Sequence, residues 1–226
     1  MKRGKKYLKV KEKIDPQKIY TVEEAVDFIK NNRVAKFDES IEIHLNLGID
    51  PKKPEQNIKG TLVFPYGGFS SKKIAAFVEP GREKEAKEAG ADIVGGKELI
   101  EKIKETQKID FDVAVATPAM MKELTQIAKI LGPKGLMPSV KTGTLTENIK
   151  EAISELKKGK ISFKNDETGN VHQVVGKLSW EKEKIIANIR SFIEALRKAK
   201  PPKVKGNFIK KAFLCSTMGP SIRIKI

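Results

Sequence analysis

Hydrophobic and polar positions alternate most clearly between Phe37 and Leu47. The odd positions from 41 to 47 carry Ile, Ile, Leu and Leu, whereas the even positions from 40 to 46 carry Ser, Glu, His and Asn. A period of two is typical of a strand with one buried face. Upstream, Thr21 and Glu24 have the spacing of a capping box, and the apolar positions after them predict a helix.

Both ends of the chain continue this mixture of strands and helices. The pattern predicts a short strand at 61–64, a β-hairpin from strands 161–164 and 171–178 around the turn 166–170, a helix from Trp180 to about Lys198 capped by Ser179, and a last strand at 208–215. Together these elements indicate an α+β domain that is discontinuous and built from both termini.

The middle of the chain has a different rhythm, in which short apolar strands alternate with helices. We expect strands at 73–78, 91–94 and 112–116, helices at 82–89, 97–105 and 118–131, and a last helix capped at Thr144 and ending near Lys158. Such alternation is typical of a parallel sheet covered on both faces. The middle block is therefore predicted to be an inserted, Rossmann-like, three-layer α/β domain.

Charge divides the chain at the same places. The whole chain carries 45 Lys and Arg against 29 Asp and Glu, a net charge of +16, yet residues 67–159 hold 16 basic and 14 acidic side chains. We therefore expect a basic domain from residues 1–66 and 160–226 and a near-neutral domain from 67–159, hinged near Pro65–Gly68 and near Gly159. A polyanion, most simply nucleic acid, is the expected partner of the basic domain.

Composition narrows the class of protein further. Hydrophobic residues make up 39% of the chain, which suffices for packed cores, and no apolar run approaches the roughly 20 residues of a membrane span. The basic start lacks the apolar segment of a secretory signal, so we expect a cytoplasmic protein without a membrane partner. Cys215 is the only cysteine and is expected to be a small buried residue. The two histidines, His44 and His172, lie far apart in sequence and are expected to face solvent. With one cysteine and no spaced His/Cys cluster, we expect neither a metal site nor a cofactor.

Two other classes compete with nucleic-acid binding by the termini. A nucleotide-dependent enzyme would use the middle block, but Gly67–Lys72 lacks phosphate-loop spacing and no Ser/His/Asp or Cys/His catalytic set is indicated. A DNA-binding regulator lacks a helix-turn-helix or zinc-finger pattern. The expectation is therefore a non-enzymatic protein.

The candidate RNA chemistry lies at strand ends, where small polar residues and glycine let a backbone approach closely. Phe37 and Met218 have the alternative of being core residues, and Glu42 and Asp166 of being plain exposed carboxylates. Residues 132–138, Gly-Pro-Lys-Gly-Leu-Met-Pro, predict either a helix stop with a rigid loop or a contact loop. The N-terminal lysines are expected to form a solvated, mobile arm that adds non-specific affinity.

These segments carry a resemblance to a known family along essentially the whole chain. The motifs are Lys36–Glu42, Leu47–Pro51, Ala89–Gly96, Ile130–Pro138, Asn165–Gly169 with His172, and Ser216–Pro220. The chain resembles the bacterial large-subunit ribosomal protein L-one family, the protein of the mobile ribosomal stalk. The segment 132–138 is highly specific to that family.

The resemblance implies partners and contact residues. The partners would be a stalk helix–junction of large-subunit rRNA, exit-site tRNA whose release the family assists, the mRNA of its own operon, which it represses, and the large ribosomal subunit, with a monomer outside the ribosome. The implied RNA-binding residues are Lys36, Phe37, Ser40, Glu42, Lys164, Asp166, Thr168, Gly169, His172, Thr217, Met218 and Gly219, with secondary contacts at Gly132, Pro133, Lys134 and Gly135.

One position departs from the family pattern. The family has Pro-His-Gly at the first crossing, whereas this chain has Pro65-Tyr66-Gly67. The replacement puts the hinge geometry in question and leaves the terminal-domain surface untouched.

Overall fold

The chain folds into two compact units. The structure, a computed structural model, describes residues 4–67, 73–204 and 206–226. One unit comprises residues 1–69 with 162–226, and the other comprises residues 70–161. The expected domains were residues 1–66 with 160–226 and residues 67–159. That each of them folds independently stays a prediction. Of the first expected hinge, Pro65–Gly68, only Gly68 lies outside the described residues, and so do residues 69–72 of the segment Gly67–Lys72.

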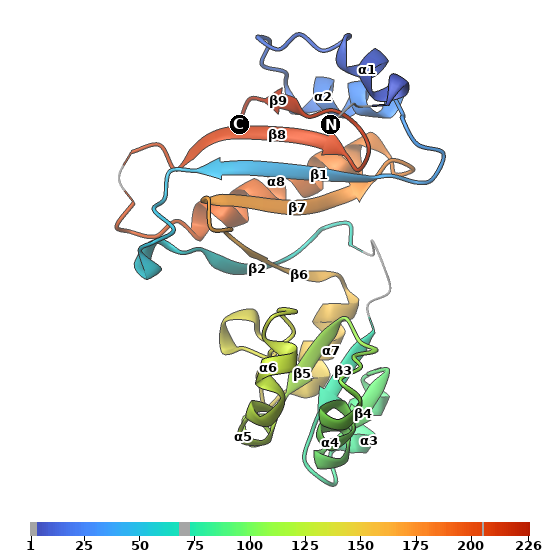
Figure 1. The fold of residues 1–226 in the computed structure, drawn as a ribbon, viewed down its shortest axis with the longest axis vertical. Coiled ribbons are helices and arrows are strands. Elements are labelled where there is room, and N and C mark those ends of the chain that lie inside the picture. Colours follow the sequence, from blue (N-terminus) through green and yellow to red (C-terminus); the bar gives the residue numbers. More distant parts are fainter. Residues whose placement is uncertain (1–3, 68–72, 205) are drawn as a thin grey trace. The chain divides into compact units, whose positions relative to one another are not determined.

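The terminal unit is built on a four-stranded antiparallel sheet of order β7-β1-β8-β9, with helices on one face (Figure 1). Its elements are α1 (Lys5–Lys11), α2 (Val22–Asn31), β1 (Ser40–Leu47), η1 (Pro54–Gln56), β2 (Lys59–Val63), β6 (Lys160–Lys164), β7 (Asn170–Lys177), α8 (Lys182–Lys198), β8 (Ile209–Ser216) and β9 (Ile222–Ile224).

The sequence pattern explains why this sheet has one buried face. The odd positions of β1 are at most 2% exposed and the even positions are partly exposed, as the alternation predicts. The apolar positions of α8 are also buried. The capping box of Thr21 and Glu24 is confirmed, since each residue's side chain bonds the other's backbone N–H. Burial of these two sets of apolar side chains leaves the other face of β1 polar.

The predicted hairpin is wrong. β6 pairs with β2 in a separate two-stranded sheet, whereas β7 pairs with β1. Only an isolated bridge, Asn165 to Val171, joins the two expected arms. Asn165 instead bonds Ile58 twice: its N–H donates to the Ile58 carbonyl and its Oδ1 accepts from the Ile58 N–H. These two bonds direct β6 toward β2 rather than toward β7.

The middle unit has the three layers expected of an α/β domain. Its sheet is parallel, of order β4-β3-β5. Its elements are β3 (Ile74–Phe77), α3 (Glu83–Glu88), β4 (Ile93–Gly95), α4 (Lys97–Thr106), β5 (Val113–Ala116), α5 (Met121–Leu124), η2 (Thr125–Ile127), α6 (Ala128–Leu131), η3 (Val140–Thr142) and α7 (Ile149–Lys157).

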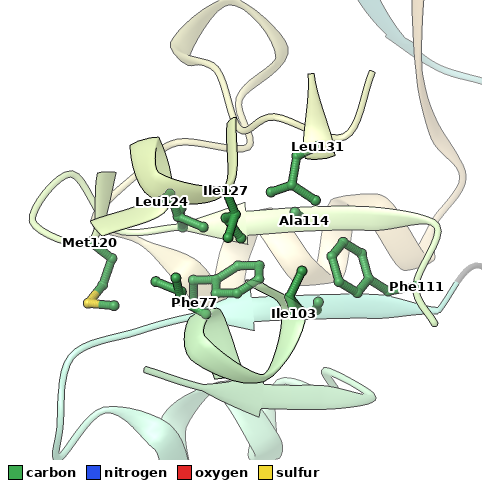
Figure 2. Close-up of a cluster of buried hydrophobic side chains, with 11 residues drawn as sticks. Phe77, Ile103, Phe111, Ala114, Met120, Leu124, Ile127 and Leu131 are labelled. Atoms are coloured by element: carbon green, nitrogen blue, oxygen red, sulfur yellow. The ribbon is translucent and has the colours of Figure 1, made fainter. Parts of the chain in front are cut away.

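Alternate residues of β3 enter two different cores. Ala75 and Phe77 belong to the cluster that includes residues of α4, η2 and α6 (Figure 2). Ile74 and Ala76 belong to the cluster that includes residues of α3 and α7. Both faces of the sheet are therefore apolar and covered, as a parallel sheet requires.

Two helix predictions in the middle unit need correction. The expected helix 118–131 is broken into α5, η2 and α6, and the Thr125 hydroxyl donates to the carbonyls of Met121 and Lys122 within it. Such side-chain bonds compete with regular helix geometry. The cap of α7 is Asn148, which accepts from the Glu151 N–H, because Thr144 is buried in a loop bonded to Ser139.

Two expectations in the terminal unit also change. Residues 5–11 form α1, a helix without buried residues, where a mobile arm was expected. Ser179 does not cap α8, whose N-cap is Glu181. The Ser179 hydroxyl donates to Asp38 at 2.8 Å instead, and its N–H donates to the same carboxylate. None of the helices in the described part of the chain has the length and apolarity that crossing a bilayer requires.

Candidate nucleic-acid interface

The unburied face of the terminal sheet carries polar side chains from three neighbouring strands, beside the partly exposed Val174 and Phe213. We call it the polar face and define it by partly or fully exposed residues of three neighbouring strands. They are Ser40, Glu42, His44 and Asn46 of β1, Asn170 and His172 of β7, and Cys215 of β8. Strand pairing places His44 opposite His172, Asn46 opposite Asn170, and Glu42 opposite Cys215.

One end of the polar face is organised by a buried carboxylate, Glu39. Its side chain is inaccessible to solvent. One oxygen accepts hydrogen bonds from the backbone N–H groups of Val34 and Ala35, at 3.2 and 2.8 Å. The other accepts from the Ser216 hydroxyl at 2.7 Å and from the Met218 N–H at 3.1 Å. Glu39 therefore fastens the loop before β1 to the loop after β8.

These bonds also fix the charge state of Glu39. Burial alone raises the pKa of this carboxyl, but the hydrogen bonds from Ser216, Ala35, Met218 and Val34 together hold the pKa below its ordinary value. The ionised form is the one that can accept four donors at once. The two loops are thus locked by a carboxylate that stays charged at neutral pH.

Arg33 adds a second restraint on the loop before β1. Its guanidinium donates to the carbonyls of Ala35, Lys36 and Phe37 at 2.6 to 2.9 Å. The Phe37 side chain is 54% exposed despite this ordered backbone. Lys36 is exposed as well. The interpretation of Phe37 as a core aromatic is therefore wrong.

The loop after β8 meets β1 through Thr217. Its N–H donates to the Ser40 carbonyl and its hydroxyl accepts from the Ser40 N–H, both at 3.0 Å. Lys177 donates to the Ser40 hydroxyl at 2.9 Å. Met218 is 53% exposed, which rules out its interpretation as a core filler. A side chain at Gly219 would meet the Ser216 hydroxyl at 2.5 Å, so this tight turn requires glycine.

These residues form one group that we call the strand-end cluster. It comprises Lys36, Phe37, Ser40, Thr217, Met218 and Gly219. The loops on both sides are ordered by hydrogen bonds, yet the two apolar side chains project into solvent. Rigid, exposed aromatic and apolar groups next to lysines are suited to contact with unpaired bases and sugar edges.

The opposite end of the polar face is the turn that leads into β7. Asp166 accepts hydrogen bonds from the N–H groups of Thr168 and Asn170, at 2.9 and 2.7 Å, and from the Thr168 hydroxyl at 2.8 Å. Burial raises the pKa of the Asp166 carboxyl, but these bonds and one from His172 outweigh it and lower the pKa well below the ordinary value. Gly169 is buried with φ +77°, a conformation that favours glycine. Asp166 and Gly169 therefore shape the turn, while Thr168 is exposed.

Two histidines lie between the two ends. The Nδ1 atoms of His44 and His172 are 2.7 Å apart, and His172 Nε2 lies 3.3 Å from Asp166. His172 is exposed as expected, whereas His44 is half-buried, and its pKa is lowered by burial and by the neighbouring His172. Cys215 is half-buried rather than buried, with its Sγ 3.1 Å from His44 Nε2.

The Cys215–His44 pair does not have the electrostatics of a thiol enzyme. Burial, with a smaller contribution from Glu42, raises the pKa of the Cys215 thiol to about 11. A catalytic cysteine needs the opposite shift, because the thiolate is the nucleophile. The close pair therefore does not restore the enzyme alternative.

The remaining candidate residues lie elsewhere. Lys164 is exposed at the end of β6, in the two-stranded sheet. The secondary set, Gly132, Pro133, Lys134 and Gly135, belongs to the middle unit, follows α6, and is exposed. Gly135 has φ +70° with open space around it. Both interpretations of this segment, a rigid stop and a contact loop, fit that geometry.

Sequence reasoning missed the residues that hold the strand-end cluster in place. They are Glu39, Arg33 and Lys177. Glu39 had a usable signal, because it shares the odd parity of the buried β1 positions and so had to point inward. No sequence signal identifies Arg33 or Lys177, because their hydrogen-bond partners are set by loop conformation and strand register.

The fold defines a protein of two units, a discontinuous α+β unit with a polar sheet face and an α/β unit with a parallel sheet. The model of the family described as "Ribosomal protein L1p/L10e family" matches residues 29–220. The chain therefore belongs to this family of structural, non-enzymatic proteins. It is 47% identical over 225 residues to "Large ribosomal subunit protein uL1" of Fervidobacterium nodosum, covering 100% of this chain and 96% of that one. It is also 47% identical to the protein of the same name from Thermus thermophilus, over 99% of this chain and 97% of that one.

Proposed function

We propose that this protein is a constituent of the large ribosomal subunit that binds a stalk helix–junction of large-subunit rRNA. The names of its relatives and the net charge of +14 on residues 1–66 and 160–226 support this assignment. The lysines supply salt-dependent phosphate affinity. The polar face and its two ends supply the contacts that depend on RNA shape.

The strand-end cluster is the observation that carries the proposal. Phe37 and Met218 are exposed large apolar side chains on loops that Glu39 locks together. Neither side chain is covered in the isolated protein, so both are available to a partner. An irregular RNA junction offers base faces and 2′-hydroxyls that such a rigid, mixed surface can cover.

The carboxylates of Asp166 and Glu42 are assigned different roles. Asp166 is saturated by its own turn, so we assign it to positioning Thr168 and His172. Glu42 is one-third exposed and lies 3.8 Å from His44 Nε2. Glu42 is therefore the carboxylate that remains able to accept a hydrogen bond from a 2′-hydroxyl.

A binding titration of the full chain with a stalk rRNA fragment tests the proposal. Met218→Ala or Thr217→Ala should weaken cognate binding about tenfold and leave random RNA of equal length nearly unaffected. Val63→Ala is the matched control, because Val63 is 42% exposed on β2, outside the cluster. Equal losses on cognate and random RNA would reject the cluster as the specific site.

Two finer roles rest on the same surface. An mRNA segment that copies the rRNA junction would occupy the polar face and repress its own operon, so Met218→Ala should reduce binding of the operon leader by the same factor as rRNA. A role in release of exit-site tRNA predicts that ribosomes lacking the protein retain deacylated tRNA longer. If leader binding survives Met218→Ala, a different surface serves the mRNA.

A further inference from the structure

Three side chains with metal-binding atoms converge at the centre of the polar face. A carboxylate oxygen of Glu42, a ring nitrogen of His44 and the sulfur of Cys215 all lie within 4.8 Å of one another. His44 Nε2 is 3.1 Å from Cys215 Sγ and 3.8 Å from Glu42 Oε2. All three side chains are half-buried, so the group is reachable from solvent.

Strand pairing builds this group from distant parts of the chain. Glu42 and His44 are two residues apart on β1 and so share one face of the sheet. β8 runs antiparallel to β1 and places Cys215 directly opposite Glu42. Directly opposed residues have Cβ atoms about 5 Å apart, which brings their side-chain ends together. The lack of a spaced His/Cys cluster in the sequence argued against a metal site, but this register brings His44 and Cys215 together in space.

We propose that Glu42, His44 and Cys215 form a binding site for a thiophilic divalent cation of the Zn²⁺ class. A tetrahedral Zn²⁺ with one sulfur, one nitrogen and one oxygen ligand holds those atoms about 3.4–3.6 Å apart. Two of the three observed separations, 3.1 and 3.8 Å, bracket that value, and the third, between Glu42 and Cys215, is at most 4.8 Å. The fourth position faces solvent and is left for water.

The neighbouring groups are arranged as a metal site requires. A metal-bound imidazole normally donates its second ring N–H to an acceptor that fixes its orientation. Here His44 Nδ1 lies 2.7 Å from His172 Nδ1, and His172 Nε2 lies 3.3 Å from Asp166. A proton on His44 Nδ1 and one on His172 Nε2 satisfy both contacts and direct the His44 Nε2 lone pair toward Cys215 and Glu42. His172 and Asp166 are thus positioning residues for the cation site.

The ligand set also selects the kind of cation. The cation replaces the proton on the Cys215 sulfur, so one S–H bond breaks, one metal–sulfur bond forms, and one proton leaves to solvent. Thiolate and imidazole favour Zn²⁺, Co²⁺ and related ions, whereas Mg²⁺ and Ca²⁺ prefer oxygen ligands. We therefore expect one thiophilic ion per chain and no effect of Mg²⁺ at the same concentration.

Titration of the full chain with Co²⁺ tests the site. Because Cys215 is the only cysteine in the sequence, a sulfur-to-cobalt charge-transfer band in the near ultraviolet can arise only from this residue. We expect that band to saturate at one equivalent and to be abolished by added Zn²⁺. Absence of the band at saturating Co²⁺ would overturn the proposal.

Variants separate the site from general loss of structure. Cys215→Ser should lose the band and weaken Zn²⁺ binding, measured calorimetrically, by roughly 100-fold. His172→Ala should weaken it about tenfold, as loss of a positioning partner does. Val63→Ala, on β2 and outside both the polar face and the strand-end cluster, is the control and should bind Zn²⁺ with unchanged affinity. Circular dichroism verifies folding of each variant, and a folded Cys215→Ser variant with unchanged Zn²⁺ affinity would reject Cys215 as a ligand.

Discussion

The two units differ in how many faces of their main sheet are buried. In the middle unit, alternate residues of β3 enter separate cores, so both sheet faces are apolar and buried. In the terminal unit, only the odd positions of β1 are buried and the even ones remain polar. In the middle unit, polar side chains therefore lie on loops such as 132–135 and on the outer faces of helices, whereas the terminal unit presents them along whole strands.

The units also differ in how they treat a buried polar group. Glu39 of the terminal unit is fully buried, and both of its oxygens accept hydrogen bonds. Thr117 of the middle unit is 2% exposed, and its hydroxyl is the buried side-chain group that lacks a partner within the described residues. A saturated group stabilises and orders its surroundings, whereas an unsatisfied one costs free energy. Replacing Glu39 should therefore lower the free energy of unfolding, whereas removing the Thr117 hydroxyl should raise it.

The largest effect is expected from Glu39→Gln. An amide cannot accept four hydrogen bonds with the strength of a carboxylate and introduces donors that face the N–H groups of Val34 and Ala35. Breaking this buried network should lower the free energy of unfolding of the terminal unit by about 3 kcal/mol. Urea unfolding followed by fluorescence of Trp180, the single tryptophan, reports on that unit.

Glu42→Gln is the control for this change. Glu42 lies on the same strand with its side chain one-third exposed, so its replacement should alter stability by less than about 0.5 kcal/mol. If the two variants unfold at the same urea concentration, Glu39 does not lock the strand-end loops.

The pH dependence sharpens the same point. The folded pKa of Glu39 lies below its unfolded value, so its stabilisation is fully present above the unfolded pKa of about 4.3 and is lost as pH falls through the folded pKa. The stability difference between the native chain and Glu39→Gln should stay constant from about pH 7 to 5 and shrink below about pH 4. A difference that is equally large at pH 3 would mean that the charge on Glu39 does not matter.

Thr117→Val should act in the other direction. Valine has nearly the same shape and removes the unpaired hydroxyl, so the middle unit should gain about 1 kcal/mol. Trp180 belongs to the terminal unit, so the stability of the middle unit is measured instead by hydrogen exchange of the β3 amides. Thr117→Ser keeps the hydroxyl and should show no gain, and a gain in that control would point to packing instead.

The sequence was informative where structure depends on near neighbours. The alternation in β1, the apolar stripe of α8 and the capping box at Thr21 were all predictable, because each is a local pattern. Strand pairing was not predictable, since β6 pairs with β2 and not with its chain neighbour β7. Ser179 failed as a cap because Asp38, 141 residues away, takes its hydroxyl.

The site shows the same limit. The exposure of Phe37 and Met218 depends on Glu39, which bonds residues 177 and 179 positions further along the chain. The Glu42–His44–Cys215 group likewise exists only through the β1–β8 register. Motifs locate such residues, but their mutual distances come from the sheet.

The smallest effect is expected from the lysines of α1, and it tests whether charge and shape are separate contributions. Lys5, Lys6, Lys9 and Lys11 lie on a helix without buried residues. Changing all four to Gln should leave the terminal unit equally stable. The slope of log affinity against log salt should fall by about 0.7–0.9 for each phosphate that these lysines no longer neutralise. Cognate and random RNA should weaken by the same factor, because phosphate contacts carry no sequence information.

A matched change in the middle unit completes this test. Replacing four of its lysines, Lys84, Lys87, Lys102 and Lys104, by Gln removes the same charge from α3 and α4 and should leave the slope unchanged. The reason is that the basic excess lies in residues 1–66 and 160–226, where phosphate attraction is strongest. If both sets of changes lower the slope equally, the whole molecule contributes to RNA attraction, and the charge difference between the two units does not direct binding.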